Sequence, residues 1–379
     1  MATGGAYKTL GENDIVSTRT LLHEAIPITG TIVSGTYFRT LGGTDETNIK
    51  NHSHGMFQTV YDYPYLSSSA NHIFDITVGI GPNSSLYNVG DQKTQVAKKR
   101  NVYNQMAQVL VGYDVTGSVL DFDIDGNILA GGGKHKDVYI LPFARLLVKD
   151  EIKKGSFSLK LGVNPSHETP FAASQINITD YSGSDGYLVN SPAGEYGILF
   201  AFNSLGTPIH TSHVASSTNG IPVGLIYYQA GICVLTSSIF DAYSATPGTG
   251  LLATRCKMTS GGDDAWDNYR VLTGSTIQAN ADEFRHRLKD ITFNNTTELN
   301  STIYFCRAHH NEYNYSTNPT YLSNSKIRVK TNASDNPVAY ITTIGLYNDN
   351  NELMAVAKLS EPLKKTPDVE FTLRVRLDY

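Results

Sequence analysis

The chain has 379 residues, of which 17% are charged, and its formal net charge is −5. Because neither a basic nor an acidic block stands out, the sequence carries no electrostatic footprint for nucleic acid or for an anionic membrane surface. No apolar run approaches the length that spans a bilayer. The 23 tyrosines and 33 glycines, with many threonines, serines and asparagines, favour strands and loops over helices.

Residues 1–25 contain few apolar side chains and little periodicity, and glycines interrupt them. We interpret this segment as an N-terminal arm that is flexible or docks on a neighbouring subunit. From Ile26 onward, short strand patterns alternate with turn residues, which predicts a first β-rich domain over 26–165.

An aromatic stretch lies early in that domain. Phe57, Tyr61, Tyr63 and Tyr65 stand at alternate or near-alternate positions before a run of serines. Such rings suit a surface that is buried against another subunit, because each contributes a large area at a small entropic cost. An ordinary half-buried strand explains the pattern equally well.

The strongest helical pattern covers 95–111. Its apolar stripe consists of Val96, Tyr103, Met106, Ala107 and Leu110. The basic cluster Lys98-Lys99-Arg100 points away from this stripe, so we expect it to be a solvated face rather than a nucleic-acid contact.

Composition predicts a second β-rich domain over 166–379. Ser, Asn, Asp, Gly and Pro dominate 165–194, which indicates a long loop or the edge of an inserted subdomain. Two apolar runs follow, Tyr196 to Phe202 and Val223 to Leu235, and a tight turn at Gln229-Ala230-Gly231 interrupts the second.

The clearest two-residue period lies at the C-terminus. From Val369 to Tyr379 apolar and polar residues alternate, which predicts a long strand with one buried face. Upstream, the extended runs 338–347 and 353–359 flank Asn348-Asp349-Asn350-Asn351, whose residues tolerate left-handed backbone conformations, so a hairpin is expected. We expect these terminal strands to form the core of a sheet.

Taken together, these patterns predict a mainly β fold. Short strands with frequent turn signals indicate an antiparallel β-sandwich or barrel body, with a few peripheral helices and long loops.

Two runs of the terminal hairpin carry a family resemblance: Tyr340-Ile-Thr-Thr-Ile-Gly-Leu-Tyr-Asn-Asp and Asn351-Glu-Leu-Met-Ala-Val-Ala-Lys-Leu. With the basic alternating strand that follows, they resemble the C-terminal portion of β-rich virion structural proteins of contractile-tailed, T4-like phages, cyanophages included. The aromatic stretch from Tyr304 to Tyr321 is similar to the same family, so the resemblance covers residues 300–379. It implies a virion structural role and brings no catalytic residue with it.

Three alternate aspartates in Asp121-Phe-Asp-Ile-Asp-Gly match the start of an EF-hand calcium loop. The twelfth position of such a loop is Gly132, which cannot supply the bidentate carboxylate that calcium needs there. A solvent-facing strand edge that ends in a hairpin turn at Asp125-Gly126 is therefore expected.

His52 and His54 are the metal candidates. In an extended segment both rings lie on one side, and three such pairs around the axis of a homotrimer would offer six nitrogens to an octahedral metal ion, as phage fibre and spike tips do by resemblance. A loop with exposed histidines is the favoured interpretation, so we predict no metal and no other cofactor.

No pattern typical of a catalytic site is present, so an enzyme is not expected. We predict a virion protein, made in the host cytoplasm, that contacts copies of itself in a three-fold or six-fold environment and also other virion proteins. The candidate interface residues are Phe57, Tyr61, Tyr63, Tyr65, Tyr313, Tyr315 and Tyr321.

The resemblance favours a location in the tail, at the baseplate or the fibre attachment, because hairpins ending in similar segments recur at the baseplate periphery. The neck or the head surface is the alternative. A carbohydrate-binding receptor protein that recognises a host glycan also stays open, because Asn- and Tyr-rich loops suit sugars and the single tryptophan, Trp266, lies in a loop segment.

Overall fold

A computed structural model of the protein describes residues 7–37, 46–87, 94–128, 133–214, 220–244, 250–261, 266–315, 322–323, 326–327 and 337–379. The chain divides into two compact units. Unit 1 consists of Met1–Leu21 and Glu298–Tyr379, and unit 2 consists of Leu22–Thr297.

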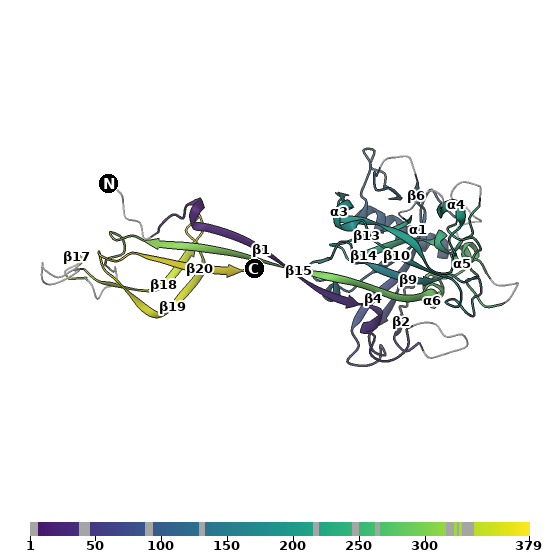
Figure 1. Ribbon diagram of the computed structural model, residues 1–379, viewed down its shortest axis with the longest axis horizontal. Coiled ribbons are helices and arrows are strands. Elements are labelled where there is room, and N and C mark those ends of the chain that lie inside the picture. The colour runs from purple at the N-terminus through teal and green to yellow at the C-terminus, as the bar shows by residue number, and fades with distance from the viewer. Residues whose placement is uncertain are drawn as a thin grey trace. The chain divides into compact units, whose positions relative to one another are not determined.

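The strands of the described residues are β1 (Ile15–Pro27), β2 (Ile49–Asn51), β3 (Gln58–Tyr61), β4 (His72–Ile80), β5 (Phe122–Asp123), β6 (Lys134–His135), β7 (Asp137–Pro142), β8 (Glu151–Ile152), β9 (Ser158–Gly162), β10 (Gln175–Thr179), β11 (Leu188–Ser191), β12 (Gly194–Leu205), β13 (Ile221–Tyr227), β14 (Ile232–Thr236), β15 (Leu288–Ala308), β16 (Leu322–Ser323), β17 (Lys326–Ile327), β18 (Ala339–Tyr347), β19 (Leu353–Lys365) and β20 (Phe371–Asp378) (Figure 1). The helices are α1 (Thr94–Leu110), α2 (Arg145–Val148), α3 (Gly183–Gly186), α4 (Thr211–Val214), α5 (Asn268–Gly274) and α6 (Ile277–Arg287), with 3-10 turns at Glu12–Asp14, Thr29–Thr31 and Ser237–Phe240.

One large sheet forms the body of unit 2. Its strands follow the order β15-β9-β10-β12-β13-β14-β7-β4-β3-β2, and the ladders along this path are antiparallel. The predicted mainly β, antiparallel fold with few helices is therefore confirmed.

Both faces of the central strands are buried. In β7, Tyr139 and Leu141 join one apolar cluster, whereas Val138 and Ile140 join another. Successive side chains of a strand point to opposite faces, so the two clusters lie on opposite sides of the sheet. This burial explains why the central strands read as continuous apolar runs rather than as alternating ones.

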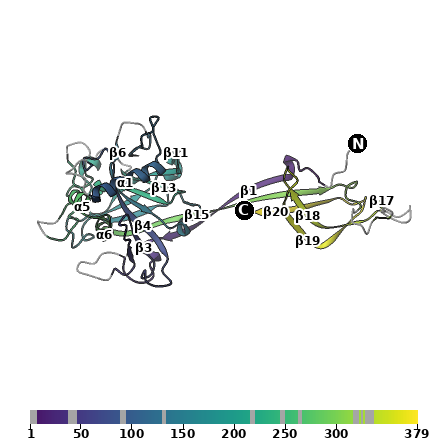
Figure 2. The same cartoon turned by 180° about the vertical axis from the view of Figure 1, so that it is seen from behind.

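Helix α1 lies beside β4 of the sheet (Figures 1 and 2). Its apolar side chains join the cluster that contains Val138 and Ile140. Its side chains Tyr103 and Ala107 are fully buried there. The helix ends at Leu110, and Gly112 follows with a φ of 94°, a left-handed conformation that glycine adopts without strain. The helix predicted at 95–111 is confirmed.

The basic cluster of α1 is not a solvated face, contrary to our expectation. The Lys99 side chain is buried, and its amine donates to the backbone oxygens of Leu272 (2.6 Å) and Ser275 (2.9 Å) at the end of α5. Burial lowers the pKa of Lys99 to about 7. The Arg100 guanidinium lies 3.6 Å from the ring centroid of Tyr87. The oxygens that accept from Lys99 are remote in sequence, so local periodicity could not predict these contacts.

The polar stretch 165–194 contains sheet strands rather than only a loop. Strand β10 lies between β9 and β12, with Gln175 opposite Gly162. Its apolar face consists of Ile176 and Ile178 alone. We predicted a loop because the segment is mostly polar, although the alternation of these two isoleucines with polar residues is typical of a strand. The domain boundary expected near residue 165 lies between β9 and β10, which pair with each other, so it falls inside unit 2.

The expected N-terminal arm is largely a strand, because β1 pairs with β15. The Ser17 and Thr302 hydroxyls lie 3.2 Å apart, and the Glu24 backbone N–H donates to Asn295 Oδ1 at 3.2 Å. Nearly every side chain of β1 is exposed. A strand exposed on both faces needs no alternation of apolar and polar residues, which explains why no strand was predicted there.

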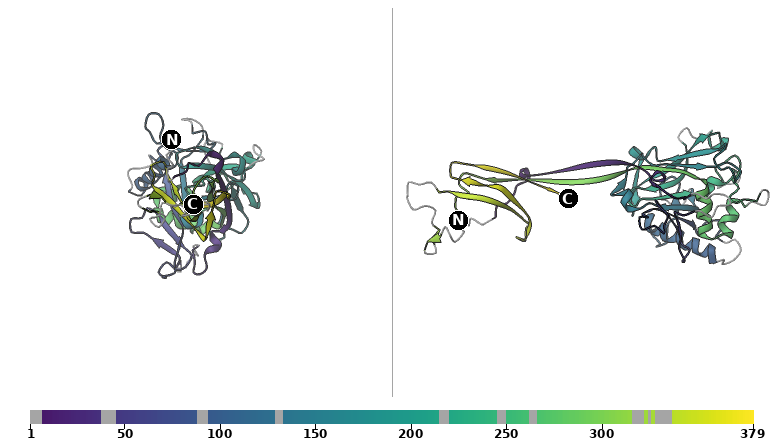
Figure 3. Two further views of the ribbon diagram at one scale, coloured as in Figure 1. Left: turned by 90° about the vertical axis from the view of Figure 1, so that its left-hand side faces the viewer. Right: turned by 90° about the horizontal axis from the view of Figure 1, so that it is seen from below.

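Unit 1 combines two small sheets. Parts of β1 and β15 pair with each other, and β20 pairs with the other edge of β15, with Ser301 opposite Asp378. Strands β18 and β19 form a separate antiparallel hairpin (Figure 3). In its loop, Asn348 Oδ1 accepts from the Asn350 and Glu352 backbone N–H groups, and Asn351 has a φ of 62°. The predicted hairpin and terminal strand are confirmed.

Candidate assembly surface

Unit 1 has almost no apolar core of its own. Among its described residues, the buried apolar side chains are those of Ala308, Ala339 and Val375, and two of these are alanines. Every other buried apolar residue that the structure describes lies in unit 2. The expectation that the terminal strands form the core of a sheet was therefore wrong, although the strands themselves are where the sequence predicts them.

The hairpin β18–β19 leaves both of its faces partly open. Ile344 and Leu346 pair with Ala357 and Ala355 on one face, and all four side chains are half-buried. On the other face Gly345 pairs with Val356 and Tyr347 pairs with Leu353. That second face is exposed.

An apolar patch covers the exposed face. We define the Gly345 patch as Tyr7, Tyr347, Leu353 and Val356, each of which is between 45% and 53% exposed. A Cβ on Gly345 would lie 2.9 Å from Tyr347 Cε2 and 3.1 Å from Leu353 Cδ1, so both side chains lean over the glycine. The Tyr7 ring contacts Tyr347 edge-on, with 4.7 Å between centroids.

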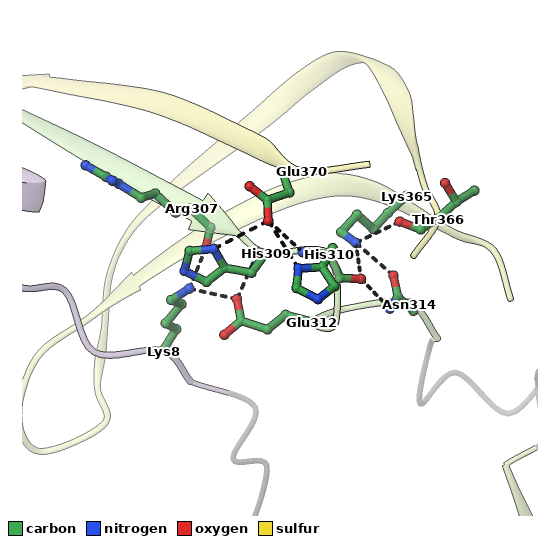
Figure 4. Close-up of polar contacts among 9 residues, drawn as sticks. All are labelled: Lys8, Arg307, His309, His310, Glu312, Asn314, Lys365, Thr366 and Glu370. Carbon is green, nitrogen blue, oxygen red and sulfur yellow. Dashed lines mark hydrogen bonds and ion pairs between the residues drawn. The ribbon is translucent and has the colours of Figure 1, made fainter. Parts of the chain in front are cut away.

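A polar network holds the other end of this hairpin (Figure 4). Lys365, at the end of β19, is fully buried, and its amine donates to His310 O (3.1 Å), Asn314 Oδ1 (2.8 Å) and Thr366 O (2.9 Å). Burial lowers the pKa of Lys365. Because a buried amine needs these acceptors, the contacts fix the end of β19 to the segment after β15.

Two carboxylates extend the network. His310 Nδ1 lies 3.2 Å from Glu370 Oε1, and the hydrogen bond from His310 lowers the pKa of Glu370. Glu312 Oε2 accepts from Lys8 Nζ (2.7 Å) and from the His309 backbone N–H (3.0 Å), and the bond from Lys8 lowers the pKa of Glu312. The network joins strand ends to one another.

The predicted interface residues fall into two groups. Phe57, Tyr61 and Tyr63 are half-buried and Tyr65 is exposed, all in unit 2. Tyr313 and Tyr315 are exposed and belong to unit 1, where Tyr313 has a φ of 52°. Tyr321 lies outside the described residues. Their role as interface residues stays a prediction.

His52 and His54 form a stack with Phe57. Their ring centroids are 5.1 Å apart, and the Phe57 ring lies 4.7 Å from that of His52 and 4.8 Å from that of His54. His52 Nε2 is 2.9 Å from Thr59 Oγ1, and His54 Nδ1 accepts from the Met56 backbone N–H. Burial, chiefly, lowers the pKa of His52.

No group of three or more metal-ligating side chains that could hold an ion occurs among the residues that the structure describes.

The aspartates at 121 and 123 do not form a solvent-facing edge, contrary to our expectation. Asp123 accepts from the Ile128 backbone N–H at 2.6 Å and lies 3.1 Å from Lys134 Nζ, and Asp121 accepts from Asn83 Nδ2 at 2.6 Å. Both aspartates are buried. The chain bends at Asp125-Gly126, with a φ of 77° at the glycine, but the expected tight hairpin turn is not there, because β5 and β6 pair across residues 124–133.

The Gly345 patch was missed by the sequence analysis. We predicted the strands of the hairpin but took them to form the core of a sheet. A glycine in the middle of an apolar strand was the available signal, because such a glycine often marks a close approach by another chain.

The chain matches no protein-family model, no curated protein and no solved structure. Among the described residues, no helix is both long enough and apolar enough to span a bilayer. What the protein does is therefore inferred from its own residues.

Proposed function

We propose that the protein is a structural subunit of a contractile-tailed phage virion, at the baseplate or the fibre attachment, and that it acts through symmetric contacts with copies of itself and with other virion proteins. The observation that carries the proposal is the missing core of unit 1. Three buried apolar side chains, two of them alanines, supply little of the burial by which an independent domain is stabilised. A partner that covers the exposed strands supplies the rest.

Two further features support an assembly role. In unit 1, β18–β19 is a two-stranded sheet without a further paired strand among the described residues, so its outer edges are open to pairing. The resemblance of residues 300–379 to phage virion proteins falls on this same unit. A three-fold or six-fold environment remains part of the proposal, and the neck or the head surface is the alternative location.

Mass spectrometry of purified virions, separated into heads, necks and tails, tests this proposal. We expect the protein in the tail fraction, at a small multiple of three or six copies per particle. Recovery with heads or necks would support the alternative location. Absence from all three fractions would contradict a structural role in the virion.

A carbohydrate-binding role is a second candidate, which the exposure of two neighbouring aromatic residues favours. Trp266 and Tyr269, near the start of α5, are both partly exposed, and the indole packs against Gly274, where a Cβ would lie 2.9 Å from Cζ3. Aromatic faces of this kind stack on sugar rings. Binding on a glycan array that Trp266→Ala removes and Tyr65→Ala retains would support this role.

A further inference from the structure

We infer that the Gly345 patch packs against the same patch of a second copy of this chain, and that the two β18–β19 hairpins run antiparallel about a two-fold axis. The inference rests on the proposed function, since it names the partner and the face of one of its symmetric contacts. Six subunits arranged with D3 symmetry, which combines a three-fold axis with two-fold axes, would contain three such pairs.

We expect the exposed apolar face of the hairpin to be buried against a partner. Tyr7, Tyr347, Leu353 and Val356 gather around Gly345 with about half of each side chain exposed, in a unit that has almost no core beneath them. Burial of aromatic and aliphatic side chains at the centre of an interface is the main source of binding energy in such contacts.

The charge of unit 1 suits self-association. Its two segments contain eleven basic and eleven acidic residues, so unit 1 has no net charge, and the −5 of the whole chain resides in unit 2. Two copies of unit 1 therefore meet without net repulsion.

The distribution of charge along the hairpin selects the antiparallel arrangement. The exposed acids Asp349 and Glu352 lie at the loop end of the patch. The exposed Lys358 and Lys364 lie at the opposite end, across from Thr343 and Tyr340, with Glu361 beside them. One end is thus acidic and the other is basic.

A two-fold axis near Leu346 brings opposite charges together. At about 3.4 Å per residue, Glu352 lies roughly 7 Å from this point on the loop side and Lys358 roughly 10 Å on the other side. Rotation about the axis places Glu352 of one copy near Lys358 of the other, twice per pair. A parallel arrangement would instead place each charge beside its own kind.

Charge reversal at these two positions tests the inference with the full-length chain. We expect Glu352→Lys and Lys358→Glu each to weaken the pair by about tenfold, as two contacts per pair become repulsive. An equimolar mixture of the two variants should pair as tightly as the wild type, because all contacts between the unlike chains are then complementary. Sedimentation velocity over a concentration series measures each case.

Two kinds of control accompany the test. Asp185→Lys and Lys136→Glu change the net charge equally at exposed positions of unit 2 and should leave pairing unchanged. Val356→Glu places two carboxylates at the centre of the contact and should abolish it, whereas Val115→Glu, at a fully exposed position of unit 2, should not.

The outcomes separate the inference from the proposed function. Single variants that pair like the wild type, a mixture that pairs no better than its components, or a wild-type chain that stays monomeric would overturn the inference. If the chain is nevertheless recovered in virions, the proposed structural role stands. A pair that behaves as expected in a chain absent from virions would overturn the proposed function alone.

Discussion

The large core of unit 2 predicts that Phe284→Ala unfolds this unit more easily at any protein concentration. The Phe284 ring in α6 is fully buried, with its centroid 4.9 Å from that of Tyr139 and 6.3 Å from that of Phe240. Truncation of a buried phenylalanine lowers the free energy of unfolding by about 3–5 kcal/mol, because transfer energy is lost and a cavity remains.

Urea denaturation followed through Trp266 fluorescence measures this change. Trp266 is the single tryptophan of the chain and lies in unit 2, so its emission reports unfolding of that unit. With a urea dependence near 3 kcal/mol per molar, as expected for a unit of this size, the midpoint should fall by about 1–2 M.

The matched control for this prediction is Val115→Ala, at a fully exposed position of the same unit, which should change the free energy of unfolding by less than about 0.5 kcal/mol. A loss below about 1 kcal/mol for Phe284→Ala, or a loss that varies with protein concentration, would refute the view that unit 2 is stabilised by its own core.

Three further predictions concern the buried amines and β1. The folded state releases the Lys99 proton near pH 7 and the unfolded state near pH 10.5. As the pH rises between these values, the free energy of unfolding of the wild type should therefore increase relative to that of Lys99→Met, by up to about 1.4 kcal/mol per pH unit. A difference in urea midpoint between the two that does not change with pH would contradict this. Lys365→Met removes the donor for His310 O and Asn314 Oδ1, so backbone amides of 309–314 should exchange hydrogen faster, whereas Lys364→Met, at an exposed position, should leave them unchanged. Equal exchange in both variants would disprove this role of Lys365. Deletion of residues 1–25 exposes the edge of β15 and should yield an aggregating product by light scattering rather than the soluble monomer that a free arm would leave; a soluble, folded monomer would show that β1 is dispensable.

Sequence periodicity located the elements whose burial follows a simple pattern. Helix α1 and strand β20 were found because each repeats its apolar residues at the spacing of one secondary structure, and the hairpin β18–β19 was found from the turn residues between its two extended runs. Strand β1 was missed because it is exposed on both faces, and β10 was missed because its two isoleucines lie in a polar segment. Prediction from periodicity and composition failed where the burial of a strand does not follow its local composition.

The candidate site was harder to predict, because it depends on tertiary contacts. Within the site, Lys365 donates to oxygens of the segment after β15. Outside the site, in unit 2, the burial of Lys99 likewise depends on carbonyl groups at the end of α5, which is remote in sequence. The extended runs and the Asn/Asp turn between them indicated the hairpin β18–β19 correctly. Whether the apolar face lies in a core or at a subunit contact depends on the surrounding chain, which alternation does not encode.

The most direct test of the central claim, that contacts with other subunits complete unit 1, is hydrogen exchange of the full-length chain as a dilute monomer and as an assembled form. We expect the backbone amides of β18, β19 and β20 to exchange rapidly in the monomer and slowly after assembly. Amides of β7 and β14 in unit 2 should be protected in both states. Equally slow exchange of the unit 1 strands in the monomer would show that this unit is stable alone, and would contradict the account.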